Sequence, residues 1–226
     1  MGHGAKAECP TCLYNNPNGL AKHNGFEETM KSVCVYCGSA DNIHPDYLLA
    51  ARQMGETLAR GGLTLIYGGG RTGLMGALAE GVLENGGQVI GIIVESMNTP
   101  ALAHPGLTRL EVVPLIHERK ARMYELADAY IALPGGYGTL DELFETLTWA
   151  QIGVHAKPVG LLNVNGYFDP LLAMLDRAEK EGFIFPEHRR SLLCAAVAEA
   201  LLDAMAKFDP PLEAVKRWMR QKADGG

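Results

Sequence analysis

The chain has 226 residues, of which 47% are apolar, so it is long enough to bury the core of one globular domain. Its formal net charge of -6 argues against a protein that binds the phosphate backbone of nucleic acids, because that binding rests on clustered Lys and Arg. No apolar stretch approaches the roughly 20 residues that cross a bilayer, and residues 1–24 lack the hydrophobic region of a signal peptide. We expect a cytoplasmic protein that binds small molecules, with neither a nucleic acid nor a membrane as its partner.

The first part of the chain, residues 1–30, is rich in Gly, Asn, Pro and His without periodicity, and we expect a flexible extension there. It contains Cys9-x-x-Cys12, which together with Cys34-x-x-Cys37 resembles the two halves of a zinc ribbon. Cys34, however, lies inside an apolar run, where a cysteine behaves as a small buried hydrophobe. We favour buried thiols and no metal, with a zinc site as the alternative.

Short apolar runs recur from position 31 onward and alternate with helical patterns. The runs are continuous rather than alternating, as expected when helices cover both faces of a parallel sheet. The predicted strands are Val33–Cys37, Leu63–Tyr67, Gln88–Val94, Leu110–Val113, Ala129–Leu133 and Pro158–Leu162. The predicted helices are Tyr47–Arg60, Gly73–Glu84, His117–Ala127, Leu140–Gln151 and Pro170–Glu181, followed by a strand and a helix within Pro186–Met205 and a short last helix.

This alternation predicts a doubly wound, Rossmann-like, mostly parallel sheet with helices on both faces, because crossovers between parallel strands are right-handed. Ligands of such sheets bind beyond the carboxyl ends of the strands. We expect one nucleotide-binding α/β catalytic domain over residues 31–208 and a C-terminal tail with a short helix over residues 209–226.

Two glycine-rich segments each follow a predicted strand and precede a helix. In the first, Gly68–Gly76, glycines such as Gly69 and Gly70 allow backbone N–H groups to approach a phosphate, and a turn that needs positive φ angles explains them equally well. The second runs from Pro134 to Glu142, and two such turns at one sheet edge could surround a single anion. Neither has the Gly-Lys-Ser/Thr ending of a P-loop, which disfavours a magnesium-dependent nucleoside triphosphatase.

Glu142 has two possible roles. Thr139-x-x-Glu142 is a capping box, in which Glu142 would fold back onto the start of its own helix. The helical spacing groups Glu142 with Glu145 and Trp149 on one side, which indicates a ligand wall or a subunit contact. The stripe expected to face the core consists of Leu140, Leu143, Phe144 and Leu147.

The segment His117-Glu118-Arg119-Lys120 opens a predicted helix. Taken alone, this segment predicts a charged, solvated turn with an ion pair from Glu118 to Arg122. The expected strand order, however, places it at the same sheet edge as Glu142, where Arg119 could meet a phosphate or a nucleobase. We expect His117 to be structural, because no partner cluster is visible.

With these motifs, and over about Val33 to Met205, the chain resembles the LOG family of cytokinin riboside 5′-monophosphate phosphoribohydrolases, whose members were often labelled lysine decarboxylases. The motifs that carry the resemblance are Cys37-Gly38-Ser39, the Gly68–Gly76 loop, His117-Glu118-Arg119-Lys120 and Pro134-Gly135-Gly136-Tyr137-Gly138-Thr139-x-x-Glu142.

The resemblance implies that Arg119 and Glu142 are the catalytic pair, that no cofactor or metal takes part, and that the protein is a homodimer or a larger homo-oligomer. Many members carry a glutamate where this chain has Ala101, which puts the specificity for base or ribose in doubt. The expected substrate-binding residues are Ser39, Gly69, Gly70, Lys120, Gly135, Gly136, Tyr137, Gly138, Thr139 and Thr148.

The reaction implied is hydrolysis of the N-glycosidic bond of an N6-modified adenosine 5′-monophosphate. Bond cleavage develops positive, oxocarbenium-like charge on the ribose, which the carboxylate of Glu142 can stabilise while it activates water. Arg119 stays charged at ordinary pH, so we expect it to stabilise the departing base or to orient the nucleotide. Phosphate binding remote from the bond would help to position the anomeric carbon.

Three other functions compete with this interpretation. A non-catalytic nucleotide or cofactor carrier on the same fold, such as a molybdenum-cofactor carrier, would use the glycine loops but has no evident use for Arg119 with Glu142. A decarboxylase would need pyridoxal phosphate on an activated lysine, and Lys120 is the only lysine in a motif. A dinucleotide-dependent dehydrogenase would leave the second loop unexplained.

Overall fold

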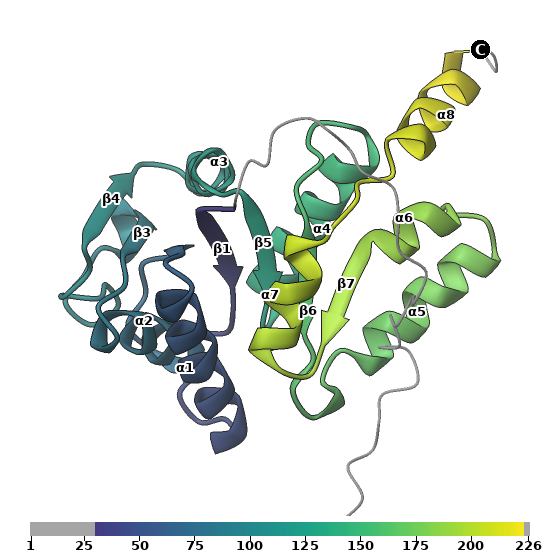
Figure 1. The fold of residues 1–226 in the computed structure, drawn as a ribbon. Helices are drawn as coiled ribbons and strands as arrows, with labels where there is room; N and C mark the ends of the chain where they lie inside the picture. The colour runs from purple at the N-terminus through teal and green to yellow at the C-terminus, as the bar shows by residue number, and fades with distance from the viewer. Residues whose placement is uncertain (1–29, 224–226) are drawn as a thin grey trace, which may run out of the picture.

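A fully parallel β-sheet forms the centre of the molecule (Figure 1), as seen in a computed structural model that describes residues 30–223, with side chains up to 217. In these residues the sheet has seven strands in the order β4-β3-β2-β1-β5-β6-β7. The predicted doubly wound, Rossmann-like fold is confirmed, and each strand pairing is parallel. The strands are β1 Ser32–Tyr36, β2 Thr64–Tyr67, β3 Val89–Val94, β4 Arg109–Val113, β5 Ala129–Ala132, β6 Val159–Leu162 and β7 Leu192–Ala195.

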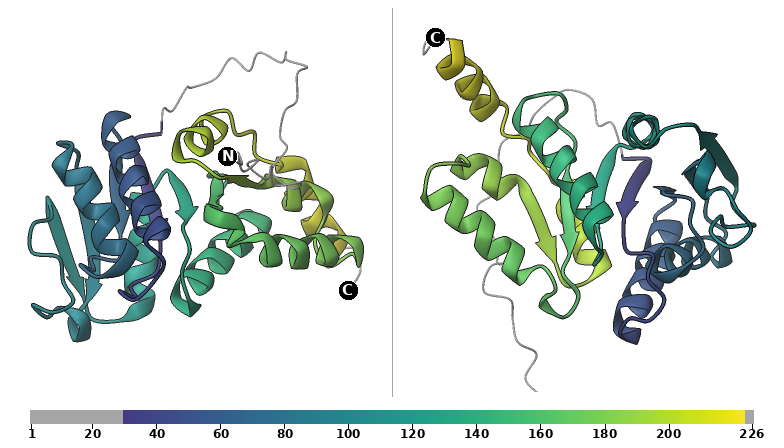
Figure 2. Two further views of the ribbon diagram at one scale, coloured as in Figure 1. Left: turned by 90° about the horizontal axis from the view of Figure 1, so that it is seen from below. Right: turned by 180° about the vertical axis from the view of Figure 1, so that it is seen from behind.

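Helices cover both faces of this sheet (Figure 2). Helices α1, α2 and α7 pack on one face, and α3, α4 and α5 pack on the other. No helix in residues 30–223 combines the length and the apolar character needed to span a membrane. The helices are α1 Pro45–Arg60, α2 Gly73–Glu84, α3 Ile116–Leu126, α4 Tyr137–Gln151, α5 Asp169–Lys180, α6 Pro186–Ser191, α7 Ala198–Ala206 and α8 Leu212–Ala223, with short 3₁₀ turns at Glu95–Met97 and Val164–Gly166.

Strand β1 shows why the apolar runs are continuous. Its side chains alternate, so that Val33 and Val35 join the core under α1 and α2, while Cys34 and Tyr36 join the core under α3 and α4. Cys34 is fully buried, as the strand interpretation predicted. The cysteines of the zinc alternative at positions 9 and 12, like the predicted N-terminal extension, lie outside the described residues.

The chain changes direction across the sheet between β1 and β5. From β1 it adds strands on one side as far as β4, and it then crosses to β5 on the other side of β1. At such a switch point the loops after the two strands diverge and leave room for a ligand. Here the loops are joined by the Gly38 amide, which donates to the Pro134 carbonyl at 3.0 Å. The predicted Cys37-Gly38-Ser39 and Pro134-Gly135 motifs therefore meet at one place.

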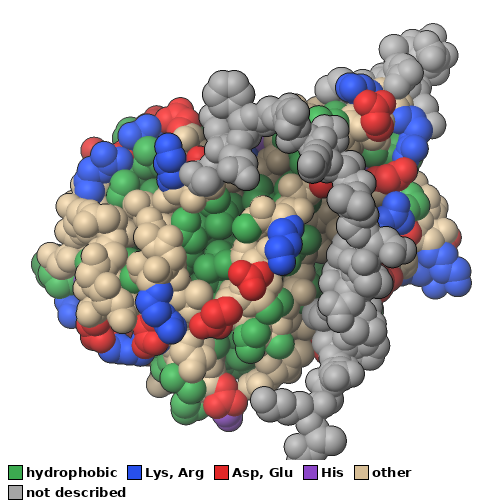
Figure 3. All heavy atoms as spheres, in the orientation of Figure 1, with side chains coloured by type: hydrophobic (Ala, Val, Ile, Leu, Met, Phe, Trp, Pro, Cys, Tyr) green, Lys and Arg blue, Asp and Glu red, His purple; other side chains and the backbone are tan. Residues whose placement is uncertain are grey.

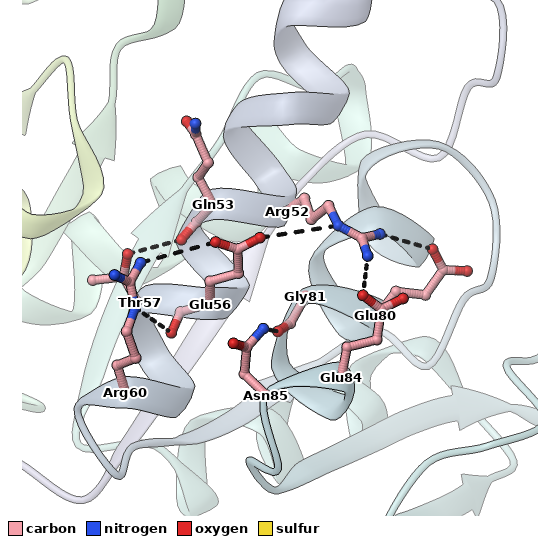
Figure 4. A network of polar contacts seen from close by, with 9 residues as sticks. All are labelled: Arg52, Gln53, Glu56, Thr57, Arg60, Glu80, Gly81, Glu84 and Asn85. Carbon is pink, nitrogen blue, oxygen red and sulfur yellow. Dashed lines mark hydrogen bonds and ion pairs between the residues drawn. The ribbon is translucent and has the colours of Figure 1, made fainter.

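Helices α1 and α2 approach each other closely through glycines. A Cβ on Gly55 would lie 2.3 Å from the Leu78 carbonyl oxygen, so only glycine fits there. Above this contact Arg52 of α1 pairs with Glu80 and Glu84 of α2 (Figure 4). Acidic and basic side chains are interspersed over this face of the molecule (Figure 3). The pairing joins the exposed sides of α1 and α2.

Helix α4 differs from its prediction in two ways. It begins at Tyr137 instead of Leu140, because Gly136 with φ −91° and ψ −150° serves as its N-cap. Thr139 is therefore buried in the first turn and does not cap the helix. The buried face consists of Thr139, Leu143 and Thr146, whereas Phe144, expected in the core, is 39% exposed. Leu140 and Leu147 pack at the edge of the core.

Candidate active site

Arg119 and Glu142 meet between the start of α3 and the second turn of α4. The Arg119 Nη1 donates to Glu142 Oε1 at 2.8 Å, and the two side chains are 13% and 11% exposed. The Arg119 Nε also donates to the Ile92 carbonyl of β3 at 2.9 Å. The predicted capping box is wrong, because the Glu142 carboxylate reaches across to α3 and Gly136 takes the cap position.

The first glycine loop makes room for this ion pair. A Cβ on Gly68 would lie 1.9 Å from the Arg119 Nη2, so the missing side chain is the space that the guanidinium fills. Gly69 and Gly73 have φ angles of +75° and +56°, which favour glycine whatever binds nearby. Gly73 also lies close to the backbone of Ser39 and Ala40. Turn geometry and packing therefore explain these glycines without a bound phosphate.

The second glycine loop differs. Gly135 is required by packing, since a Cβ there would lie 2.1 Å from the Thr139 Oγ1 and 2.8 Å from the Gly38 amide nitrogen. Gly136 and Gly138, by contrast, are exposed, have nothing within 4 Å of an added Cβ, and are not among the glycines with positive φ. Because these two residues have no side chains, the backbone amides at the start of α4 stay uncovered, and no side chain of the described residues caps the helix. The first-turn amides and the helix dipole thus point at open space, which suits an anion.

A cavity of about 370 Å³ lies beside this helix start. Its walls include Ser39, Gly135 and Gly136, which the sequence predicted as substrate-binding residues. Tyr47 and Tyr167 complete the walls, and the Tyr167 hydroxyl donates to the Gly135 carbonyl at 2.7 Å. The size is within the range of small-molecule sites, and the place is the switch point of the sheet.

Lys120 ties α3 to α4 next to the Arg119–Glu142 pair. Its Nζ bonds to Asp141 Oδ2 and Glu145 Oε1, each at 3.0 Å. Burial lowers the pKa of Lys120, but the hydrogen bonds to the two carboxylates outweigh burial and raise it. The grouping of Glu142, Glu145 and Trp149 on one side of α4 is confirmed, because all three contact α3. Glu142 pairs with Arg119 and Glu145 with Lys120, and the Trp149 ring lies edge-on to Tyr124 with 4.8 Å between the ring centres.

Burial raises the pKa of Glu142 above that of an ordinary glutamate, and Arg119 only partly offsets this. The carboxylate is therefore more basic than an exposed one, a property that suits a general base. A polar pair lies behind it: the Thr146 Oγ1 donates to the Glu142 carbonyl at 2.8 Å and lies 3.0 Å from the Tyr36 hydroxyl. The sequence interpretation did not single out Thr146, whose bond to the main-chain carbonyl four residues earlier is a common contact in helices.

Two other predicted substrate-binding residues, Tyr137 and Thr148, lie apart from the Arg119–Glu142 pair. Tyr137 is 93% exposed at the start of α4. Thr148 lies about 9 Å further along α4 and about 120° around it from Glu142, by helix geometry. It lines a different cavity, and its Oγ1 donates to the Phe144 carbonyl at 2.7 Å. Within one chain, Thr148 therefore does not lie next to Arg119 and Glu142.

Two further predictions can be compared with the structure. The expected ion pair from Glu118 to Arg122 is wrong, because Arg122 pairs with Glu111 and Glu125. Ala101, where a family glutamate was expected, is exposed in the loop after β3. This loop packs on the first glycine loop, since the Arg71 amide donates to the Leu102 carbonyl at 2.9 Å.

Comparison with known proteins adds relatives of known activity. A family model described as possible lysine decarboxylase matches residues 75–205. The probable cytokinin riboside 5′-monophosphate phosphoribohydrolase LOGL3 of Oryza sativa subsp. japonica is 45% identical over 81% of this chain and 87% of its own length. The enzyme of that activity from Rhodococcoides fascians is 50% identical over 76% and 88%, and LOG7 of Arabidopsis thaliana is 43% identical over 84% and 89%.

Solved structures with the same fold include carriers. The molybdenum cofactor binding protein of Rippkaea orientalis superposes with a TM-score of 0.61 at 25% identity, over 80% of this chain and 98% of its own. The molybdenum cofactor carrier protein of Chlamydomonas reinhardtii has the same TM-score at 20% identity, over 79% and 98%. At 20% identity the second likeness is one of fold alone.

Proposed function

The chain belongs to the LOG family of cytokinin riboside 5′-monophosphate phosphoribohydrolases, and on this premise we propose that Arg119 and Glu142 carry its reaction. It is a hydrolase that breaks the N-glycosidic bond of N6-modified adenosine 5′-monophosphates, and it releases the free base and ribose 5-phosphate. The observation that supports the assignment of the site is the buried 2.8 Å ion pair beside an uncapped helix start.

Glu142 acts on the anomeric carbon. Its carboxylate stabilises the positive charge that develops on the ribose and removes a proton from the attacking water. The raised pKa makes it a stronger base than an exposed glutamate. The ion pair with Arg119 holds the ionised carboxylate in place. When the nucleotide binds, water is excluded from a carboxylate that is already mostly buried, which strengthens its interaction with the ribose.

Arg119 acts on the departing base. Its guanidinium stays charged at ordinary pH, so it stabilises negative charge and does not deliver a proton. Bonds to the Ile92 carbonyl and to Glu142, together with the space left at Gly68, fix its orientation before substrate arrives. This fixed orientation lowers the cost of arranging charge in the transition state.

The 5′-phosphate binds at the start of α4. The amides of Gly136, Tyr137, Gly138 and Thr139 receive it there, and Ser39 completes the wall on the β1 side. Lys120 adds positive charge close by while it holds α3 against α4. Gly69 and Gly70 contribute through the shape of the first loop. Nucleotide contact by Thr148, the homo-oligomer and the cytoplasmic location stay predictions.

Two of the three alternative functions can be compared with the site, and both account for less of it. A carrier on this fold has no evident use for a buried Arg119–Glu142 pair, although proteins with the same fold are named molybdenum cofactor carriers. A decarboxylase, the activity named in the family model's description, needs a lysine of lowered pKa to form an imine. The pKa of Lys120 is raised, and its ammonium group is held by two carboxylates.

Incubation of the protein with AMP and with isopentenyladenosine monophosphate tests this function. We expect adenine or isopentenyladenine to appear together with an equal amount of ribose 5-phosphate. The dephosphorylated riboside should react far more slowly, because it lacks the group that anchors the substrate at α4. Release of base without ribose 5-phosphate, or no release from either nucleotide, would contradict the proposal.

A further inference from the structure

A second cavity lies on the side of α4 that faces away from Arg119. It has a volume of about 110 Å³ and is bounded by α4, α5, α6 and residues 208–215. The segment that leads from α7 to α8 passes over it, between α4 and α6 (Figure 1). Its walls are mainly apolar and come from distant parts of the chain: Leu147, Val159, Leu175, Ile184, Leu192 and Phe208.

One wall residue, His188, has an unsatisfied polar atom. The residue is 8% exposed, and its Nε2 has no hydrogen-bond partner among the described residues. Burial lowers the pKa of His188 and so favours the neutral ring, whose Nε2 still needs a hydrogen-bond partner. Buried polar atoms are rarely left unpaired in proteins, because the lost hydrogen bond to water is not replaced.

The charged groups in the walls are already engaged. Arg189 donates to Asp176 through Nε at 2.8 Å and pairs with the same oxygen through Nη2 at 2.7 Å. The Lys157 ammonium donates to the Tyr124 carbonyl at 3.0 Å and lies 4.4 Å from the centre of that residue's ring. Both cations thus have partners, and the lining includes no Asp or Glu. Among the described residues of the lining, His188 is the one with a buried polar atom left without a hydrogen bond.

We propose that this cavity binds a small, mainly apolar, neutral molecule whose single hydroxyl or carbonyl group bonds to His188. Mainly apolar walls with a few polar groups that fix orientation are typical of small-molecule sites, and an apolar cavity of about 150 Å³ accepts molecules such as benzene. Because less than 1 Å² of the Nε2 is exposed, the imidazole turns slightly when the ligand bonds to it. The ring stacks on Phe185, so this turn also shifts that contact.

This cavity is separate from the Arg119–Glu142 pair and from the start of α4. Phe144 and Thr148 face the cavity, whereas Glu142 faces α3 from another side of the same helix. The proposal therefore does not rest on the proposed function, and failure of either leaves the other standing.

Calorimetric titration of the full chain with benzyl alcohol, toluene and benzoate tests the proposal. Benzyl alcohol should bind saturably and about three- to tenfold more tightly than toluene, which lacks the hydroxyl. Benzoate should bind most weakly, because its charge would lose water without gaining a free cation. In His188→Phe the advantage of benzyl alcohol over toluene should disappear, while toluene still binds.

Two control variants locate the binding. Ala150→Phe fills the cavity from α4 and should abolish binding of all three probes, whereas Ala173→Phe, on an exposed position of α5 outside the lining, should change nothing. Circular dichroism tests whether both variants are folded. If Ala150→Phe is unfolded, His188→Phe still gives an independent result. Saturating AMP should leave the affinity for benzyl alcohol unchanged. Absence of saturable binding, displacement by AMP, or equal affinity in wild type and folded Ala150→Phe would overturn the proposal.

Discussion

The two glycine loops have similar sequences but different structural reasons for their glycines. In the first loop, Gly68 makes room for Arg119, while Gly69 and Gly73 adopt positive φ angles. In the second loop, Gly136 and Gly138 meet no neighbour and need no unusual φ. A glycine-rich turn after a strand is therefore not by itself a phosphate site. The glycines that packing does not require are the ones that indicate a ligand.

The largest expected effect is at the carboxylate beside the second loop. Glu142→Gln should slow release of base by at least about 10³-fold, because it removes both the base and the negative charge near the ribose. Nucleotide affinity, measured by calorimetry, should change little. Glu145→Gln on the same helix is the matched control and should retain most of the activity, since Lys120 keeps Asp141.

A first-loop variant should act through Arg119 and not through phosphate binding. In Gly68→Ala the new methyl group would overlap the guanidinium, which lies at the end of a flexible side chain and can move away. We expect activity to fall about 10²-fold, and the free energy of unfolding by about 1–3 kcal/mol, because the shift weakens the buried ion pair with Glu142. Phosphate anchoring should persist, so we expect ribose 5-phosphate to inhibit this variant and the wild type to the same extent. Loss of that inhibition would mean that the first loop holds the phosphate.

A pair of alanine variants sharpens the contrast between the loops. Gly73→Ala forces a side chain onto φ +56° and against the Ala40 carbonyl at 2.6 Å, so unfolding by urea should show a loss of about 2–3 kcal/mol. Gly138→Ala, in the first turn of α4, should leave stability equal or raise it by up to about 1 kcal/mol. Its methyl group should instead hinder the phosphate and raise KM. The reverse pattern would contradict the comparison.

The smallest expected effect is in the pH dependence. The pKa of Glu142 is raised by burial, so the ionised base should be lost at a higher pH than for an ordinary glutamate. The acid limb of kcat/KM should therefore lie above pH 4.5, the ordinary value for this group. By linkage, a carboxyl with a raised pKa stabilises the fold at low pH and loses that contribution as the pH rises through its folded pKa. Wild type should thus lose stability relative to Glu142→Gln over that interval.

Much of the fold and part of the site follow from the sequence. The continuous apolar runs predicted the strands, and the strand order predicted that Arg119 would approach Glu142. The predicted start of α4 at Leu140 was wrong, because Gly136 caps the helix without a side-chain bond. A glycine in this position leaves no capping side chain to recognise in the sequence. The pKa of Glu142 depends on burial between two helices. The second cavity joins residues as distant as Leu147 and Phe208, and no local pattern indicates it.

A crystal structure of Glu142→Gln with AMP tests the central claim most directly. We predict intact AMP with its phosphate on the amides at the start of α4, and with its anomeric carbon facing residue 142 and Arg119. A phosphate bound over the Gly68–Gly76 loop, or an anomeric carbon turned away from residue 142, would contradict the proposed roles of the second loop and of Glu142.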